Sequence, residues 1–212
     1  MKKSRAKIKK IIGQKINNDK PFTILFVCSG NSCRSPMAKG IMDKIIQNYL
    51  KESQQRVKIM TLSAGTVAPN GQLPTANAQK AALEYGADIH HHLSAPLTME
   101  RIKMADLILA MQEKHKIAIL ELVPEVKNKT FIITEYINQN KLGIDDPLSH
   151  SFEKYQETAK ELYELLLKIY KKIIKKINQK NFSPQRHRAT GDSQRFISFF
   201  LCVFVSLWYI LY

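Results

Sequence analysis

Two side chains near the start of the sequence, Cys28 and Arg34, have the chemistry needed to attack and hold a phosphoryl group. Five residues separate them, which is enough backbone to surround an anion with successive N–H groups. The thiolate is the attacking form of cysteine, and a helix that begins here should lower the pKa of Cys28. The planar guanidinium of Arg34 can bind two phosphoryl oxygens. The spacing therefore predicts a nucleophilic sulfur that faces an arginine across a ring of amide donors.

The residues around these two side chains suit the same task. Gly30 allows the backbone to approach a bound anion closely. The Asn31 amide can hydrogen-bond the loop to itself, and the Ser35 hydroxyl can donate to the Cys28 sulfur, which improves it as a leaving group. We call this segment the 28–35 loop. Its predicted phosphate-binding residues are Ser29, Gly30, Asn31, Ser32, Cys33 and Ser35.

The segments on either side of the loop indicate how it is positioned. Residues 22–27 form a short apolar, β-rich run that predicts a buried parallel strand. Pro36 suits the first turn of a helix, and apolar residues follow at helical spacing over 37–50. A buried structural cysteine near a helix start would give the same bare spacing. The agreement of strand, loop and helix favours the catalytic interpretation.

The rest of the sequence alternates between strand and helix patterns. Further strands are expected at 57–63, 106–111 and 131–134, and helices at 76–85, 98–105, 113–122 and 151–177. This alternation predicts an α/β fold, a three-layer doubly wound sheet of four parallel strands with helices on both faces. Ligands bind such sheets beyond the carboxyl ends of the strands, where the 28–35 loop is expected.

The net charge of +15 comes from the two ends of the chain. Residues 1–20 carry eight Lys or Arg and one acid, residues 168–212 carry nine and one, and the middle is neutral. A neutral middle argues against a core that binds specific nucleic acids. We expect a basic extension at 1–20, one domain at 21–180, and a linker with an apolar tail at 181–212.

Compartment and membrane contact can also be predicted from composition. The chain has only three cysteines and no signal-peptide pattern, which favours the reducing cytoplasm. Residues 196–212 are 17 uncharged residues, at the lower limit for a membrane span. The basic ends and this tail leave membrane contact, or tethering by the tail, as one alternative. An incidental tail is the other.

The run Cys28-Ser-Gly-Asn-Ser-Cys-Arg-Ser-Pro-Met-Ala38 resembles the active-site loop of low-molecular-weight protein tyrosine phosphatases. Segments 62–66 and 105–111 also resemble this family, and the resemblance covers about residues 22–175. It implies hydrolysis of phosphorylated proteins through a phosphocysteine, without metal or cofactor. It also implies a general acid from an Asp-Pro pair. Asp146, directly before Pro147, is the predicted acid and Asp145 the second choice, although a plain turn would look the same.

Two positions bear on the substrate that the resemblance implies. Tyrosine phosphatases of the family usually have a bulky aliphatic residue before the second cysteine and aromatic residues after the Asp-Pro pair. Here these positions hold Ser32 and Leu148. The bacterial protein-arginine phosphatase branch has a small hydroxyl residue at the first position, so phosphoarginine is favoured and phosphotyrosine is the alternative. Arsenate reductases of the same fold need cysteines in mid-chain, and residues 35–180 contain none.

Other residues allow more than one interpretation. Cys33 is either a redox partner that forms a reversible disulfide with Cys28 or a packed thiol. The run 90–92 of three histidines is expected in a surface loop, with a metal site as the alternative. His115 and His150 are expected to have surface or packing roles. A contrasting hypothesis for the whole chain is a non-catalytic protein that binds phosphate or is tethered to a membrane.

Overall fold

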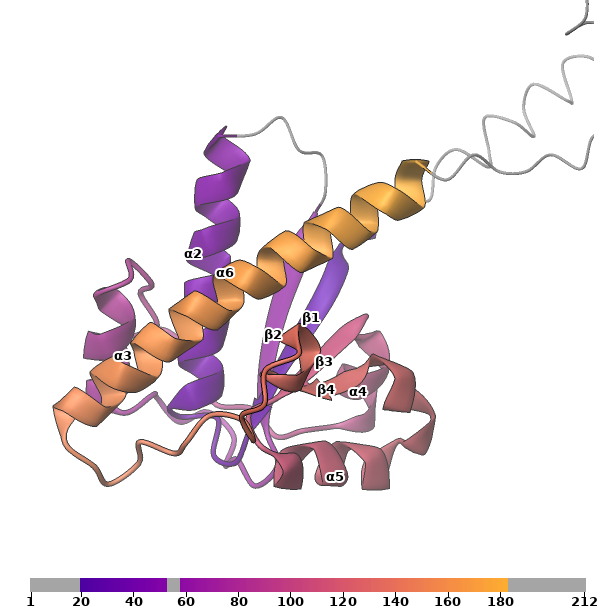
Figure 1. Cartoon of the computed structure of the whole chain (residues 1–212). Coiled ribbons are helices and arrows are strands. Elements are labelled where there is room, and N and C mark those ends of the chain that lie inside the picture. Colours follow the sequence, from indigo (N-terminus) through magenta and orange to yellow (C-terminus); the bar gives the residue numbers. More distant parts are fainter. Residues whose placement is uncertain (1–19, 53–57, 183–212) are drawn as a thin grey trace, which may run out of the picture. The chain divides into compact units, whose positions relative to one another are not determined.

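The computed structural model describes residues 20–52 and 58–182. Its sheet has four parallel strands in the order β2-β1-β3-β4 (Figure 1). The strands are β1 (Phe22–Cys28), β2 (Ile59–Gly65), β3 (Leu107–Ala110) and β4 (Thr130–Ile132). The predicted four-stranded parallel α/β fold is confirmed.

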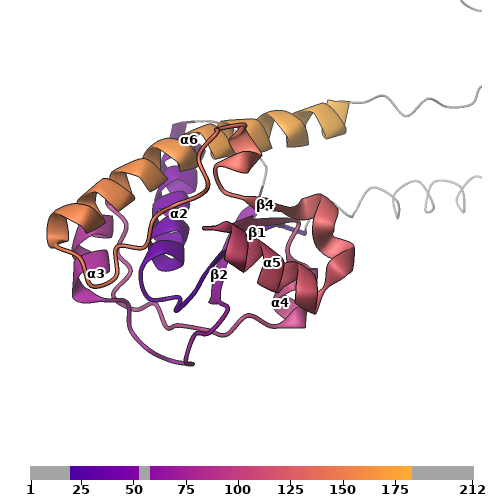
Figure 2. The same cartoon turned by 60° about the horizontal axis from the view of Figure 1, so that its bottom comes forward.

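Alternate residues of β1 pack into two separate cores. Ile24 and Phe26 belong to one core with α2 (Arg34–Glu52), α3 (Ala76–Leu83) and α6 (Phe152–Phe182). Leu25 and Val27 belong to the other, with α4 (Met99–Met104) and α5 (Glu113–Leu122). Figure 2 shows these two groups of helices on opposite sides of the sheet. Because every second side chain of a strand points to the same face, the apolar run of β1 holds three layers together.

The strand order places a topological switch point at the end of β1. The chain leaves β1 to form β2 on one side, and then crosses to form β3 on the other. Cys28, the last residue of β1, pairs with Gly65, the last residue of β2. Ligands of open α/β sheets bind at such a switch point, and the 28–35 loop lies there.

Some predicted element bounds were wrong by a few residues. The second strand lies at Ile59–Gly65, later than the predicted 57–63, because β2 pairs with β1 as far as Cys28. The fourth strand was expected to reach residue 134, but it ends at Ile132, and a short 3-10 helix, Glu135–Ile137, follows it. A further 3-10 segment, Pro124–Lys129, precedes β4. None of these shifts moves the 28–35 loop.

The chain divides into two compact units, Met1–Ile177 and Asn178–Tyr212, and the 28–35 loop lies in the first. Within 20–52 and 58–182, no helix is both long enough and apolar enough to cross a membrane. The predicted basic extension 1–20 and the apolar tail 196–212 lie outside the described residues, apart from Lys20.

Candidate active site

The 28–35 loop is held open by the side chain of Asn31, which is completely buried. Asn31 adopts the left-handed backbone region with φ of 50°, which asparagine tolerates better than most residues. Its amide nitrogen donates to Ser35 Oγ at 2.8 Å and to Ser63 Oγ at 3.0 Å. Its amide oxygen accepts from the Ala95 N–H at 2.9 Å. Asn31 therefore ties the loop to α2, to β2 and to the segment before α4.

Backbone contacts from the segment after β2 brace the outside of the loop. The N–H groups of Thr66 and Val67 donate to the carbonyl oxygens of Cys28 and Ser29, at 3.0 and 3.1 Å. Gly65 permits this approach, because a Cβ at that position would lie 2.3 Å from the Ser29 carbonyl oxygen. With two of its carbonyls engaged outside, the loop can direct its amides inward.

The Cys28 sulfur lies inside the loop and is bonded there. Its Sγ is 2.9 Å from Ser35 Oγ, and the backbone N–H groups of Ser35 and Asn31 also bond it. Ser35 Oγ accepts from the Asn31 amide, and its hydroxyl lies within reach of the sulfur and, at 3.4 Å, of the Ala64 carbonyl oxygen. This matches the geometry expected for Ser35 from the sequence.

The prediction that the loop lowers the pKa of Cys28 is wrong for this conformation. Burial of the sulfur raises the pKa of Cys28, and this effect exceeds the lowering by the Ser35 bonds, the Arg34 charge and the Asn31 bond. The Arg34 guanidinium, one of the groups that lower this pKa, pairs with the Asp146 carboxylate.

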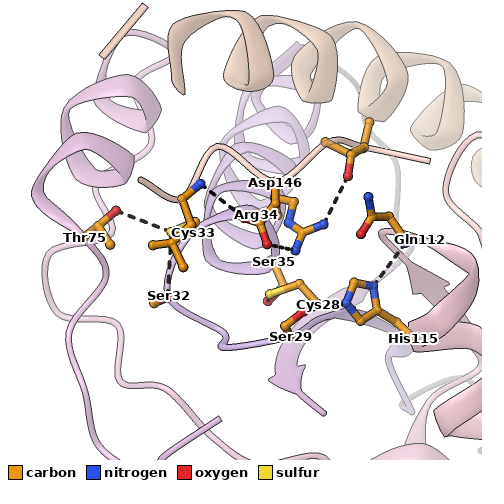
Figure 3. Close-up of polar contacts among 12 residues, drawn as sticks. Cys28, Ser29, Ser32, Cys33, Arg34, Ser35, Thr75, Gln112, His115 and Asp146 are labelled. Atoms are coloured by element: carbon orange, nitrogen blue, oxygen red, sulfur yellow. Dashed lines mark hydrogen bonds and ion pairs between the residues drawn. The ribbon is translucent and has the colours of Figure 1, made fainter. Parts of the chain in front are cut away.

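Arg34 and Asp146 meet beside Cys28, although 112 residues separate them in sequence. The Arg34 side chain is buried, and its Nη1 donates to the Ile144 carbonyl oxygen at 3.1 Å. Its Nη2 donates to Asp146 Oδ2 (Figure 3). The structure thus brings together the three predicted catalytic residues, whereas Asp145 is exposed.

A close backbone contact places the segment that carries Asp146. The Ile144 N–H donates to the Met111 carbonyl oxygen, at the end of β3, at 2.7 Å. Gly143 has a φ of 100°, and a Cβ there would lie 2.1 Å from that same oxygen. A glycine is therefore required where the segment crosses the end of β3.

Comparisons with known proteins agree with this geometry. Residues 23–180 match the sequence model of a family described as low molecular weight phosphotyrosine protein phosphatase. The chain belongs to this family. It is 36% identical to the protein-arginine-phosphatase of Bacillus subtilis (strain 168), over 72% of this chain and 97% of that protein. It is 29% identical to the low molecular weight protein-tyrosine-phosphatase Etp of Escherichia coli (strain K12), over 74% and 95%.

A solved structure of the YwlE arginine phosphatase, a mutant with a phosphorylated active-site serine, has the same fold. It superposes with a TM-score of 0.66 at 33% identity, and the match covers 72% of this chain and 96% of that one. The chain is therefore a protein phosphatase of the low-molecular-weight family, with relatives named for arginine and for tyrosine.

The second cysteine of this phosphatase is packed among hydroxyl groups. Cys33 Sγ is 3.5 Å from Thr75 Oγ1, 3.6 Å from Tyr155 OH and 3.7 Å from Ser32 Oγ. Both Cys28 and Cys33 are free thiols. These contacts suit a packed thiol, and the reversible disulfide with Cys28 stays a prediction.

Sequence reasoning missed two histidines of the phosphatase. His115 was expected to have a surface or packing role; it is buried, and the contact that was missed is its bond to Ser29 of the loop. His92 was assigned to a surface loop, yet it is half-buried with Nε2 3.3 Å from Asn31 Oδ1. One feature of the sequence could have pointed to His115: it lies in the first turn of the helix that follows β3, and β3 pairs with β1. In the part of the chain that the structure describes, no group of three or more His, Cys, Asp or Glu could hold a metal ion.

Proposed function

We propose that this phosphatase removes phosphate from arginine residues of proteins through a phosphocysteine on Cys28. The observation that carries this proposal is the convergence of the Cys28 sulfur, the Arg34 guanidinium and the Asp146 carboxylate at the end of β1. A nucleophile, an anion-binding fork and an acid are the three parts that such a displacement needs.

In the first step, the Cys28 thiol gives its proton to solvent and the resulting thiolate attacks phosphorus. An S–P bond forms and the bond to the leaving group breaks. Arg34 and the loop amides hold the phosphoryl oxygens, where the negative charge is concentrated. A phosphoryl group and the Asp146 carboxylate compete for the same guanidinium, so the bound substrate would release Asp146 toward the leaving group. Once released, the Asp146 carboxylate takes up a proton from solvent and donates it to the leaving guanidino nitrogen.

In the second step, water attacks the phosphocysteine. Asp146, now a carboxylate, accepts a proton from that water, the S–P bond breaks, and inorganic phosphate forms. The Ser35 hydroxyl and the amides at the sulfur stabilise the departing thiolate. The phosphorylated serine in the YwlE mutant supports a covalent phosphoenzyme at the equivalent position of that relative.

The preference for phosphoarginine rests on Ser32 and Leu148. Ser32 is half-buried in the loop and offers a small hydroxyl, which suits a polar guanidinium better than a phenyl ring. Leu148 is 51% exposed and supplies no aromatic face after the Asp-Pro pair. Together with Asp146, which can accept hydrogen bonds from a guanidinium, these residues favour phosphoarginine.

The experiment compares kcat/KM on two peptides of one sequence that carry either phosphoarginine or phosphotyrosine. We expect the higher value for phosphoarginine, and no turnover of either peptide by Cys28→Ala. A higher value for phosphotyrosine would overturn the substrate assignment and leave the reaction in place. Failure of the reduced protein on both peptides and on p-nitrophenyl phosphate would favour the non-catalytic phosphate-binding alternative.

We also propose that the enzyme acts in the cytoplasm. Its chemistry needs a reduced Cys28, and the two buried thiols of the loop are free, which suits a reducing compartment. Fractionation of the full chain tests this proposal together with tethering by residues 196–212. Recovery in the soluble pool is expected, and recovery in the membrane pool that is lost on truncation after residue 182 would establish the tether.

A further inference from the structure

His115 occupies an unusual place for a residue without an assigned role. It lies in the first turn of α5, yet its side chain is only 1% exposed and reaches the beginning of the 28–35 loop. Figure 3 shows its imidazole beside Cys28 and Ser29, on the opposite side of Arg34 from Thr75 and Cys33. Its Nε2 is 2.9 Å from Ser29 Oγ.

The hydrogen bonds of the imidazole decide where its proton lies. Nδ1 accepts from the Gln112 N–H at 3.1 Å, so Nδ1 carries no proton in this conformation. The proton of the neutral ring is therefore on Nε2, which donates to Ser29 Oγ. A second proton on Nδ1 would point at the Gln112 N–H, a donor facing a donor.

The charges around His115 also keep it neutral. Burial is the main effect, and the positive charges of Arg34 and Lys114 add to it, whereas the Asp146 carboxylate opposes it. Together they lower the pKa of His115 to about 4. At neutral pH the imidazole is thus a fixed donor to Ser29. With its proton on Nε2 and Nδ1 engaged by the backbone, it cannot act as the general base for water.

The hydrogen bond from His115 fixes the role of the Ser29 hydroxyl, and Ser29 is the residue directly after the nucleophile. Its oxygen accepts from His115, and within the described residues His115 is its only side-chain partner. The hydroxyl proton is therefore left for another acceptor. The nearest anionic acceptor that the reaction supplies is a phosphoryl oxygen held over Cys28.

We infer that His115 is a positioning residue of this phosphatase, whose Nε2–H fixes Ser29 Oγ as an acceptor and directs the Ser29 hydroxyl proton to the transferring phosphoryl group. The inference rests on the proposed function only in its use of Cys28 as the nucleophile. It requires that His115 act through Ser29. It also requires that the hydrogen bond from Ser29 to the phosphoryl group strengthen as charge develops on the phosphoryl oxygens.

The test uses three variants of the full chain with p-nitrophenyl phosphate. His115→Asn keeps an oxygen close to the place of Nδ1 to accept from the Gln112 N–H, but it removes the donor to Ser29. His115→Gln keeps a donor that can reach Ser29 Oγ. Ser29→Ala removes the hydroxyl itself. Thermal unfolding of each variant separates loss of fold from loss of activity.

We expect kcat to fall roughly tenfold in His115→Asn and up to about a hundredfold in Ser29→Ala, with smaller changes in KM. His115→Gln should recover part of the loss. In the Ser29→Ala background, His115→Asn should have no further effect on kcat, because its route to the substrate is already absent.

Three results would overturn the inference while wild-type turnover shows that the reaction itself is intact. The first is a kcat in Ser29→Ala equal to that of the wild type, and the second is a wild-type kcat in folded His115→Asn. The third is a kcat of the Ser29→Ala, His115→Asn double variant that has fallen by the product of the two single losses. If His115→Asn fails to fold, the kcat of His115→Gln is compared in the wild-type and Ser29→Ala backgrounds. A loss in the wild-type background that recurs in Ser29→Ala would overturn the inference. Absence of turnover in the wild-type protein would instead contradict the proposed function.

Discussion

The cradle and the rim of this active site are built in opposite ways. We define the cradle as the 28–35 loop without Ser32, together with Asp146, and the rim as the two residues of the specificity argument, Ser32 and Leu148. The cradle side chains Asn31 and Arg34 are 0% and 1% exposed, and both are hydrogen-bonded to other parts of the chain. Of the rim residues, Ser32 is half-buried and Leu148 is 51% exposed.

This difference separates the reaction from the choice of substrate. A buried cradle with satisfied polar groups presents fixed donors to a developing charge, which is what catalysis needs. An exposed rim can change residue by residue without loss of the core. The chemistry should therefore be sensitive to small changes in the cradle, and the substrate preference to changes near the rim.

The largest effect is expected from Asp146→Asn, which removes the acid and releases Arg34. Turnover should fall about 10²–10⁴-fold. Alkylation of Cys28 by iodoacetamide at pH 7 should become faster, because the freed guanidinium lowers the pKa of the Cys28 thiol. Mass spectrometry of the 28–35 peptide measures this rate.

The neighbouring Asp145→Asn is the matched control for that variant. Asp145 is exposed, so both turnover and alkylation should stay near wild type. Slower alkylation in Asp146→Asn than in Asp145→Asn would contradict the account of the Cys28 pKa.

The next effect comes from the brace behind the loop. Gly65→Ala forces a methyl group toward the Ser29 carbonyl oxygen, so the loop must move and kcat should fall about a hundredfold. Gly71→Ala in the same segment is the control, because no atom lies within 4 Å of its added methyl group. Its φ of 80° strains alanine and lowers stability, but kcat should change little. Equal losses of kcat would argue against the brace.

A smaller effect concerns stability against acid. His115 takes up its proton with a pKa of about 4 in the folded chain, against 6.5 for an ordinary histidine. Between these values the unfolded chain binds more protons, so the free energy of unfolding falls as the pH drops from 6.5 to 4, by at most about 3 kcal/mol. Above pH 6.5 this contribution is complete and constant. Urea unfolding of wild type and His115→Asn across this window should reveal a steeper slope in the wild type.

The smallest effect is expected in the choice between substrates. Ser32→Leu gives the loop a bulky aliphatic wall that suits a phenyl ring and removes a hydroxyl that suits a guanidinium. The ratio of kcat/KM for phosphoarginine over phosphotyrosine peptides should fall roughly tenfold. Turnover of p-nitrophenyl phosphate serves as the control for intact chemistry. An unchanged ratio would remove Ser32 from the specificity argument.

The cradle could be predicted from sequence to the extent that its residues are close together in the chain. The apolar run before Cys28 and the helical pattern after Pro36 placed the 28–35 loop between β1 and α2. The alternation of strands and helices was sufficient to predict the parallel sheet, because each helix returns the chain to the end of the sheet where the previous strand began. Asp146 was found only through the family's Asp-Pro pattern.

The missed features all depend on contacts between distant segments. Burial of the Cys28 sulfur raises its pKa, and Asp146 pairs with Arg34 although 112 residues separate them. His115 is 86 residues from Ser29, and no periodicity in the sequence reports that contact. The ends of β1 and β3 had to be adjacent before its role could be recognised.

The central claim is that Cys28 carries the phosphoryl group during turnover. Rapid quenching of the Asp146→Asn variant with 32P-labelled p-nitrophenyl phosphate, whose leaving group needs no acid, followed by peptide mapping, tests it most directly, because loss of the base slows hydrolysis of the intermediate. The account predicts label on the peptide that contains Cys28 and none in the Cys28→Ala control. Phosphate release without label on that peptide, or label that persists in Cys28→Ala, would contradict it.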